Sequence, residues 1–416
     1  MKILIVGLTT RAVAESAVGA GVDVVTVDYF GDLDQKGVCR NISLRERRLA
    51  YGPAAFLSVA GDLAYDAVVY TGGLENAPDT VAALAAGRQL LGNDPETLRR
   101  VRDPGTVLSF LAGQGWRVPR TIPADGARPT RGTWLRKPMR GGGGLGVRRW
   151  RGGSIGSTEM LQEYVRGVPA SAIFVADGRR SRILGLSEQL SGRSGFVYGG
   201  NLLPLTAPST VRDEVDAIVA ALTREFGLRG VNGLDFVLSR GRPVTLEVNP
   251  RYSASMELLE RAAGVSVFRL HLDGCEGRLP ATPIVPRGAW GKAIVYARAP
   301  VQVGDTRGWM ARGVRDVPHP RERFERGQPI CTVFASAAKP SDCRARLFAE
   351  RAAMWRQCQG LAVGPPSCIP EPLRAVTRSE PPSSTESTPT TRRRSPSDSS
   401  TTPWARIRSP ASATLQ

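Results

Sequence analysis

Several residue types and patterns that mark common kinds of protein are scarce in this chain of 416 residues. It holds only two histidines, and none of its six cysteines forms a C-x-x-C pair, so we do not expect a zinc site. No apolar run approaches the roughly 20 residues that cross a membrane. The N-terminal apolar run is too short for a signal peptide and is typical of a first strand. We therefore expect a cytoplasmic protein with no membrane association.

Lysine is also scarce, with five residues against a large excess of arginine, and the net charge is +18. The segment from Ile369 onward holds seven arginines and four acidic residues, so the remainder is still about +15. A nucleic-acid partner would explain such a charge, but the arginines are scattered and form no basic stripe interleaved with aromatic residues. The composition favours an acidic small substrate or a plain compositional bias over nucleic acid.

The segment 231–251 has the pattern of a β-hairpin with acidic residues on one face, because apolar and polar residues alternate on both sides of a turn-like stretch. Folded about Gly241, it sets Asp235 opposite Glu247, with Asn249 on the same face. Two opposed carboxylates repel each other, and a hard cation such as Mg²⁺ would offset the repulsion. The pattern predicts a metal site, although an ordinary hairpin with a solvated polar face fits it as well.

The segment 133–150 has the composition of a phosphate-binding loop. An apolar run ends in Lys137-Pro138, and four consecutive glycines follow: Gly141, Gly142, Gly143 and Gly144. Glycines let backbone N–H groups approach an anion, and the lysine adds a point charge suited to phosphate. The segment is neither a Walker A loop nor a dinucleotide fingerprint, since the residues that define those motifs are absent. Taken alone, four glycines also fit a flexible loop.

Taken in order along the chain, these segments and one more resemble the signature of the ATP-grasp superfamily. That signature is a Lys-Pro with a glycine-rich lid loop, a short Gln-Glu-aromatic-hydrophobic-x-Gly strand, an acidic residue and a Glu-x-Asn-Pro-Arg motif. The matching pieces are Lys137-Pro138, Gly141 to Gly144, Gln162-Glu163-Tyr164-Val165-Arg166-Gly167, Asp235 and Glu247-Val248-Asn249-Pro250-Arg251. The resemblance covers residues 1–270 and is nearest to the ATP-dependent carboligase-like branch of carboxylate–amine ligases.

The resemblance implies a role for each piece. Lys137 and the N–H groups of Gly141, Gly142, Gly143 and Gly144 would bind the ATP phosphates. The adenine would meet the strand formed by Gln162, Glu163, Tyr164 and Val165. The ligands of Mg²⁺, or of Mn²⁺, would be Asp235, Glu247 and Asn249. Arg251 would be catalytic, because a guanidinium can stabilise the charge on a transferring phosphoryl group.

Two departures from the family pattern leave parts of the ATP site open. Many relatives carry a glutamate soon after the hinge glycine to bind the ribose, whereas this chain has Val168-Pro169-Ala170. Many also carry an Asp-Lys whose lysine contacts the phosphates, whereas this chain has Arg102-Asp103-Pro104. The ribose-binding residue is therefore not assigned, and Arg102 is a candidate for the second phosphate cation.

The sequence predicts an α/β fold, α+β in the grasp unit, in four regions. Residues 1–95 predict a small parallel-sheet domain, because strand and helix patterns alternate. Residues 96–265 predict an ATP-grasp unit of two α+β subdomains, and residues 266–368 a small C-terminal region. Residues 369–416 are rich in Ser, Thr, Pro and Arg and predict a disordered tail.

Ligands of parallel sheets bind at the carboxyl ends of the strands, where Gly7 to Thr10, Asp28 and Gly72 to Asn76 would lie. These residues also fit ordinary strand-end turns. The resemblance implies that this domain helps to hold the second substrate.

As a whole, the resemblance implies an ATP- and Mg²⁺-dependent ligase. It would activate a small-molecule carboxylate as an acylphosphate and join it to an amine or thiol, releasing ADP and phosphate. The alternatives are a bicarbonate-using carboxylase relative, a nucleotide-binding protein without catalysis and a basic nucleic-acid binder. A carboxylase would need a separate biotin carrier, since the chain has no Met-Lys-Met motif. A homo-oligomer also remains open.

Overall fold

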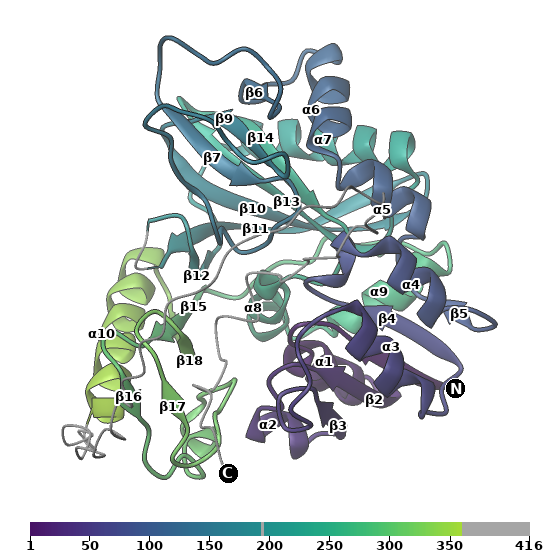
Figure 1. The fold of residues 1–416 in the computed structure, drawn as a ribbon, viewed down its shortest axis with the longest axis vertical. Coiled ribbons are helices and arrows are strands. Elements are labelled where there is room, and N and C mark those ends of the chain that lie inside the picture. Colours follow the sequence, from purple (N-terminus) through teal and green to yellow (C-terminus); the bar gives the residue numbers. More distant parts are fainter. Residues whose placement is uncertain (193–194, 360–416) are drawn as a thin grey trace, which may run out of the picture.

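The computed structural model describes residues 1–192 and 195–359. The predicted disordered tail, 369–416, lies outside the described residues. Figure 1 shows the N-terminal domain beside a larger body built on a long antiparallel sheet, with a smaller sheet above it. In the part of the chain that is described, no helix is long and apolar enough to cross a membrane.

The N-terminal domain is a five-stranded parallel sheet with strand order β3-β2-β1-β4-β5. Buried apolar residues on both faces of β1 and β4 explain why these short runs form central strands of a parallel sheet. Its strands are β1 (Lys2–Val6), β2 (Asp23–Asp28), β3 (Arg40–Ser43), β4 (Ala67–Tyr70) and β5 (Gln89–Leu90). Its helices are α1 (Arg11–Gly19), α2 (Leu33–Lys36), α3 (Pro53–Gly61), η1 (Leu74–Asn76) and α4 (Pro78–Leu84).

Two short helices, α5 (Pro95–Val101) and α6 (Pro104–Gly113), connect this domain to the body. Each begins with a proline after an aspartate whose side chain accepts a hydrogen bond from a backbone N–H in the first turn. Asp103 is the capping residue of α6. The residues that depart from the family's Asp-Lys pattern therefore form a helix start.

The body is organised by a seven-stranded antiparallel sheet in the order β14-β13-β10-β11-β12-β15-β18. Helix α7 (Ser209–Phe226) packs on one face, and α8 (Ala254–Ala263) and α9 (Val267–Cys275) pack on the other. The strands are β10 (Val168–Asp177), β11 (Ser181–Ser191), β12 (Tyr198–Leu203), β13 (Arg229–Ser239), β14 (Arg242–Asn249), β15 (Ala289–Tyr296) and β18 (Pro329–Ala337).

Strands β15 and β18 lie in the region predicted to begin at residue 266, yet they pair in the same sheet as the preceding strands. Helix α10 (Pro340–Gln359) packs on them. The same region holds a two-stranded sheet of β16 (Val301–Gln302) and β17 (Arg323–Phe324) and the short helix η2 (Met310–Arg312). The predicted boundary at residue 265 therefore does not separate two sheets.

A second sheet has four strands in the order β6-β9-β7-β8, and its labelled strands lie in the upper part of Figure 1, level with β14. Its strands are β6 (Thr121–Ile122), β7 (Trp134–Pro138), β8 (Arg148–Arg149) and β9 (Glu159–Glu163). The predicted Lys-Pro and Gln-Glu segments thus lie on neighbouring strands, β7 and β9, which pair antiparallel.

Buried polar contacts join the N-terminal domain to the body. Arg11, of which 1% is exposed, pairs with Glu257 of α8 and with Asp316 at 3.0 Å. His271 of α9 accepts a hydrogen bond at Nδ1 from the N–H of Val231 at 3.0 Å. Its Nε2 lies 3.1 Å from the carbonyl oxygen of Leu91, so a neutral imidazole with its proton on Nε2 satisfies both contacts. Burial lowers the pKa of His271 to about 4.

Candidate functional site

The hairpin of β13 and β14 sets two carboxylates opposite each other. Asp235 pairs with Glu247, and Gly233 with Asn249, in the predicted register. Toward the turn the register shifts by one residue, so that Ser239 pairs with Arg242. The predicted register is therefore right at the acidic residues and wrong beyond them.

The register shifts because the turn and the acidic pair require pairings that differ by one residue. A two-residue turn at Arg240 and Gly241, with φ angles of 52° and 74°, closes the hairpin. Positive φ at both central residues is typical of the tight turns that match the twist of paired strands. A β-bulge next to Phe236 absorbs the one-residue difference between this turn and the pairing of Asp235 with Glu247.

Asp235 is held by two side-chain amides. It accepts hydrogen bonds from Nε2 of Gln189 at 2.7 Å and from Nδ2 of Asn249 at 3.0 Å. Burial, followed by the charge of Glu247, raises the pKa of Asp235 to about 7. The pair is thus electrostatically strained, which is the condition that a bound cation would relieve.

The donor set fits Mg²⁺ better than a softer metal. No group of three or more His, Cys, Asp or Glu that could hold a metal occurs among the described residues. Mg²⁺ needs only one or two carboxylates when substrate phosphates and water complete its shell. The amide nitrogen of Asn249 faces Asp235, and its oxygen faces Arg251. Because the oxygen is the atom that would bind a metal, binding would require this amide to rotate.

Lys137 and the glycine loop lie on the opposite side of the site. Nζ of Lys137, on β7, donates a hydrogen bond to Oε1 of Gln162 on β9 at 3.0 Å. The carbonyl oxygen of Gly143 accepts from the N–H of Tyr198 at 2.9 Å. At Gly144 a Cβ would lie 1.8 Å from the carbonyl oxygen of Phe196, so only glycine fits there. The loop is therefore docked on the turn between β11 and β12.

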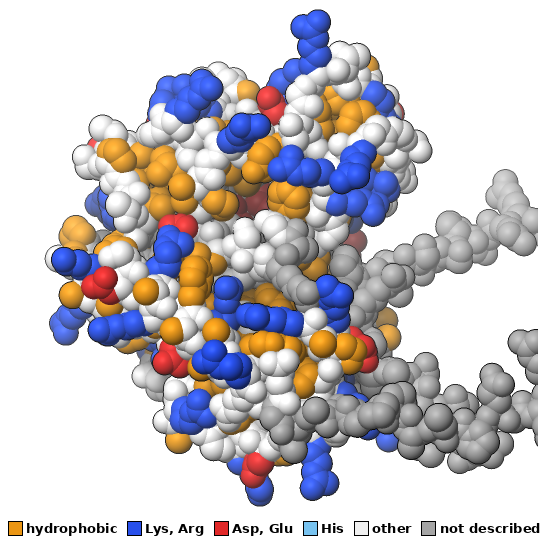
Figure 2. All heavy atoms as spheres, turned by 90° about the vertical axis from the view of Figure 1, so that its left-hand side faces the viewer, with side chains coloured by type: hydrophobic (Ala, Val, Ile, Leu, Met, Phe, Trp, Pro, Cys, Tyr) orange, Lys and Arg blue, Asp and Glu red, His pale blue; other side chains and the backbone are white. Residues whose placement is uncertain are grey.

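A cavity of about 430 Å³ opens between the four-stranded sheet, the glycine loop and the seven-stranded sheet. Every predicted cofactor-binding residue lines it: Lys137, Gly141, Gly142, Gly143, Gly144, Gln162, Glu163, Tyr164 and Val165. Asp235 and Glu247 line it too. Asn249 and Arg251 do not: Asn249 bonds to the lining residue Asp235, and Arg251 bonds to Asn249. Figure 2 shows a hollow on this side of the molecule with an acidic side chain at its floor.

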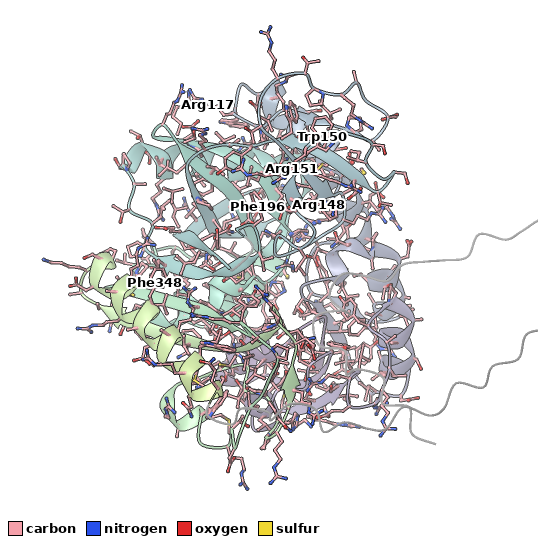
Figure 3. The ribbon with its side chains drawn as sticks, turned by 60° about the vertical axis from the view of Figure 1, so that its left-hand side comes forward. Arg117, Arg148, Trp150, Arg151, Phe196 and Phe348 are labelled. Carbon is pink, nitrogen blue, oxygen red and sulfur yellow. The ribbon has the colours of Figure 1, made fainter. Side chains whose placement is uncertain are left out.

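The β11–β12 hairpin supplies cavity residues that the sequence analysis missed: Gln189, Ser191, Phe196 and Tyr198. Phe196 packs edge-on against Tyr164, whose ring also lies under the guanidinium of Arg149. Figure 3 places Phe196, Arg148 and Trp150 in the upper half of the molecule, where the four-stranded sheet lies. The hairpin carries no motif, and only its pairing with β10 brings it to the site.

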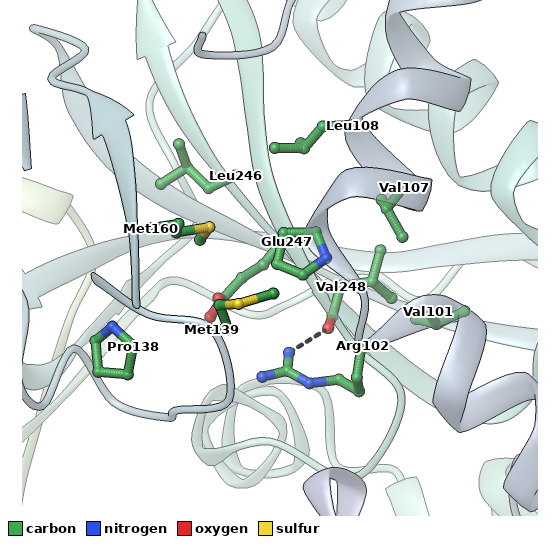
Figure 4. Close-up of a pocket in the computed structure, with 11 residues that line it drawn as sticks. Val101, Arg102, Val107, Leu108, Pro138, Met139, Met160, Leu246, Glu247 and Val248 are labelled. Atoms are coloured by element: carbon green, nitrogen blue, oxygen red, sulfur yellow. Dashed lines mark hydrogen bonds between the residues drawn. The ribbon is translucent and has the colours of Figure 1, made fainter. Parts of the chain in front are cut away.

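All three side-chain nitrogens of Arg102 donate hydrogen bonds to oxygens of the protein, which does not favour its predicted role as a second phosphate cation. Its Nε donates to Oδ1 of Asn76 at 3.0 Å, Nη1 to the carbonyl oxygen of Val248 at 3.0 Å and Nη2 to that of Gly141 at 2.9 Å. Figure 4 shows the bond to Val248 beside the Glu247 side chain. Arg102 thus ties together the N-terminal domain, strand β14 and the glycine loop.

The loops at the carboxyl ends of β1 and β4 lie next to each other, as their parallel pairing predicts. The N–H of Leu8 donates to the carbonyl oxygen of Gly72 at 2.8 Å. Asp28 is fully buried and accepts hydrogen bonds from Thr10 and from the N–H of Gly31. Asp28 therefore holds the loops after β1 and β2 in place rather than facing a ligand.

Comparison with known proteins finds a matching family over part of the chain. Residues 103–255 match a family described as ATP-grasp domain. An uncharacterized protein of Methanocaldococcus jannaschii is 23% identical over 355 residues, which cover 80% of this chain and 88% of that protein. Other curated relatives are much longer, and this chain spans 11–14% of their length.

Two solved structures share the fold. N5-carboxyaminoimidazole ribonucleotide synthetase from Thermus thermophilus has a TM-score of 0.63 and 19% identity, over 87% of this chain and 100% of that chain. L-amino acid ligase from Bacillus licheniformis has a TM-score of 0.63 and 15% identity, over 85% of this chain and 97% of that chain. The fold class and the family resemblance predicted from the sequence are confirmed.

Proposed function

Since the chain carries an ATP-grasp domain, we propose that this protein is an ATP- and Mg²⁺-dependent ligase that activates a small-molecule carboxylate as an acylphosphate. The acylphosphate is then joined to an amine or a thiol, with release of ADP and phosphate. The carboxylate and amine substrates and a cytoplasmic location are parts of this proposal.

One observation carries it: a single cavity is lined both by Lys137 with four consecutive glycines and by the opposed carboxylates of Asp235 and Glu247. Lys137 and the glycine-loop N–H groups suit the phosphates of ATP. Asp235, Glu247 and Asn249 suit Mg²⁺, which when bound neutralises charge on the β- and γ-phosphates. A cavity of about 430 Å³ also lies in the range of small-ligand sites.

The reaction needs positioning and charge stabilisation more than a side-chain nucleophile. An oxygen of the substrate carboxylate attacks the γ-phosphorus, and the bond to the ADP oxygen breaks. The amine then attacks the carbonyl carbon and loses a proton, and phosphate leaves with the former carboxylate oxygen and takes up that proton. Arg251 stabilises the transferring phosphoryl group. The docked glycine loop excludes water that would hydrolyse the acylphosphate.

This atom balance gives a direct test. Purified protein is incubated with Mg-ATP and pools of carboxylates labelled with ¹⁸O, with and without amines, while ADP release is followed. A ligase transfers one ¹⁸O from its carboxylate to the released phosphate, and Glu247→Gln abolishes both signals. Label transfer from bicarbonate alone would support the carboxylase alternative. ADP release without ¹⁸O transfer, or no ADP release, would overturn the proposal.

A further inference from the structure

We infer that Glu75, contributed by the N-terminal domain, is a positioning residue that fixes the guanidinium of Arg251 for phosphoryl transfer. The inference rests on the proposed function and deepens it, because it assigns part of the catalytic geometry to a domain outside the ATP cavity. Glu75 lies in η1, directly after β4, whereas Arg251 follows the metal-site strand β14.

The two side chains form a buried ion pair between the domains. Nε of Arg251 donates to Oε1 of Glu75 at 2.8 Å. The side chain of Glu75 is 1% exposed and that of Arg251 is 13% exposed, so solvent screens their attraction only weakly. A guanidinium is not deprotonated in proteins, so the pair joins opposite charges even without a bound substrate.

Glu75 is itself held in place by its own loop. Its Oε2 accepts a hydrogen bond from the N–H of Gly73 at 2.5 Å. Gly73 has a φ angle of +101°, and a Cβ there would lie 2.0 Å from the hydroxyl oxygen of Tyr51. At Gly72 a Cβ would lie 3.7 Å from Cζ of Arg251, so the loop backbone packs close to the guanidinium. Both carboxylate oxygens of Glu75 are thus used for orientation.

The ion pair with Glu75 uses Nε of Arg251 and leaves some N–H groups of its terminal nitrogens without an acceptor among the described residues. Nη1 donates to the carbonyl oxygen of Tyr252 at 3.1 Å, and Nη2 to Oδ1 of Asn249 at 3.3 Å. A guanidinium has five N–H groups in a fixed plane. With Nε bound to Glu75, each terminal nitrogen keeps one N–H without an acceptor among the described residues. These two donors match the oxygens of a transferring phosphoryl group.

The inference predicts a loss of rate that is not a loss of ATP binding. Glu75→Gln removes the charge that orients Arg251, so ADP formation should fall at least tenfold while stabilisation by Mg-ATP is unchanged. Glu75→Asp keeps the charge and should retain more of the rate. Glu322→Gln is the matched control. Glu322 pairs with Arg45 of the N-terminal domain, so this ion pair also joins the domain to the body, but at a different part of the junction.

A double-mutant cycle separates positioning from plain stability. If Glu75 acts through Arg251, the rate loss of Glu75→Gln combined with Arg251→Lys equals that of Arg251→Lys alone. An unchanged rate in Glu75→Gln would overturn the inference. So would additive losses, or an equal loss in the Glu322→Gln control.

A second measurement does not depend on turnover. In protein labelled with ¹⁵N-arginine, the Nε–H signal that Arg251→Lys removes should be protected from exchange in wild type and in Glu322→Gln. In Glu75→Gln that protection should be lost, and its persistence would overturn the inference while leaving the proposed function intact. A protected proton in a wild type that forms no ADP would instead refute the proposed function, and with it any role of the pair in phosphoryl transfer.

Discussion

Replacing Glu247 by glutamine should stabilise the metal-free protein and abolish its response to Mg²⁺. In the described residues no hydrogen bond ends on the Glu247 side chain, so the substitution breaks none, although it also removes a charge that attracts Arg251. It does remove the like charge that faces Asp235 across the strand pair. Loss of a carboxylate that is expected to bind metal would thus increase stability, the opposite of what most substitutions do.

The magnitude follows from the geometry. Directly opposed side chains have Cβ atoms about 5 Å apart, and two unit charges at that separation repel by about 3 kcal/mol at an effective dielectric constant of about 20. Glu247 is partly exposed, so solvent lowers the gain to about 1 kcal/mol.

The gain should also depend on pH. Because burial and Glu247 raise the pKa of Asp235 to about 7, Asp235 is charged at pH 8 and protonated at pH 5.5. A raised carboxyl pKa means that the folded state binds more protons than the unfolded state between about pH 4 and 7. The contribution of Asp235 to the free energy of unfolding is therefore present at low pH and is lost as pH rises through 7. The gain in Glu247→Gln should therefore appear at pH 8 and shrink at pH 5.5.

Urea unfolding in EDTA at both pH values measures this difference, and thermal shifts with ATP and Mg²⁺ measure the lost response. Glu214→Gln is the matched control, because Glu214 of helix α7 pairs favourably with Arg242 of the same hairpin at 2.6 Å. The control should gain no stability and should keep its Mg²⁺ response. A Glu247→Gln protein that is no more stable than wild type at pH 8, or that still responds to Mg²⁺ with ATP, would refute the reasoning.

Two further predictions concern groups outside the metal pair. Arg102→Ala frees the carbonyl oxygen of Gly141 and should speed hydrogen–deuterium exchange of residues 141–144 several-fold, and unchanged exchange would contradict the anchoring role. Because the pKa of His271 is about 4 against about 6.5 for a free histidine, the folded state binds fewer protons in that window. Stability should therefore fall as pH drops from 6.5 to 4, by about 3 kcal/mol from this residue. NMR titration of the two histidines, assigned with His319→Asn, checks this, and a His271 signal that titrates near pH 6.5 would contradict it.

Local pattern was sufficient for the hairpin that carries the acidic pair. Two local signals, the alternation with period two and the turn at Arg240-Gly241, come from residues that are neighbours in the sequence. The strands and the opposed Asp235 and Glu247 could therefore be predicted. The bulge could not, because it arises from a one-residue mismatch between the turn and the site. Neither the sequence of the turn nor that of the strands indicates this mismatch by itself.

Contacts between distant segments were beyond the sequence. The pairing of β12 with β15 joins Leu203 to Trp290, and no local signal specifies it. Glu75 is separated from Arg251 by 176 residues and follows two glycines in a loop, where an acidic residue is ordinary. Gln189 contacts Asp235 only because of the sheet order. The family signature located the cavity, and the fold supplied the residues that orient its groups.

The central claim is that the cavity binds Mg-ATP, and thermal stabilisation tests it most directly. Wild type, Lys137→Ala and Lys339→Ala are heated with ATP, with and without Mg²⁺; Lys339 is an exposed lysine that does not line the cavity. Binding at a ligand concentration of 100 times Kd stabilises the folded state by about 2.7 kcal/mol. We predict a Mg²⁺-dependent shift in wild type and Lys339→Ala that is weakened in Lys137→Ala. No shift in well-folded wild type would contradict the account and leave an ATP-grasp fold without its ligand.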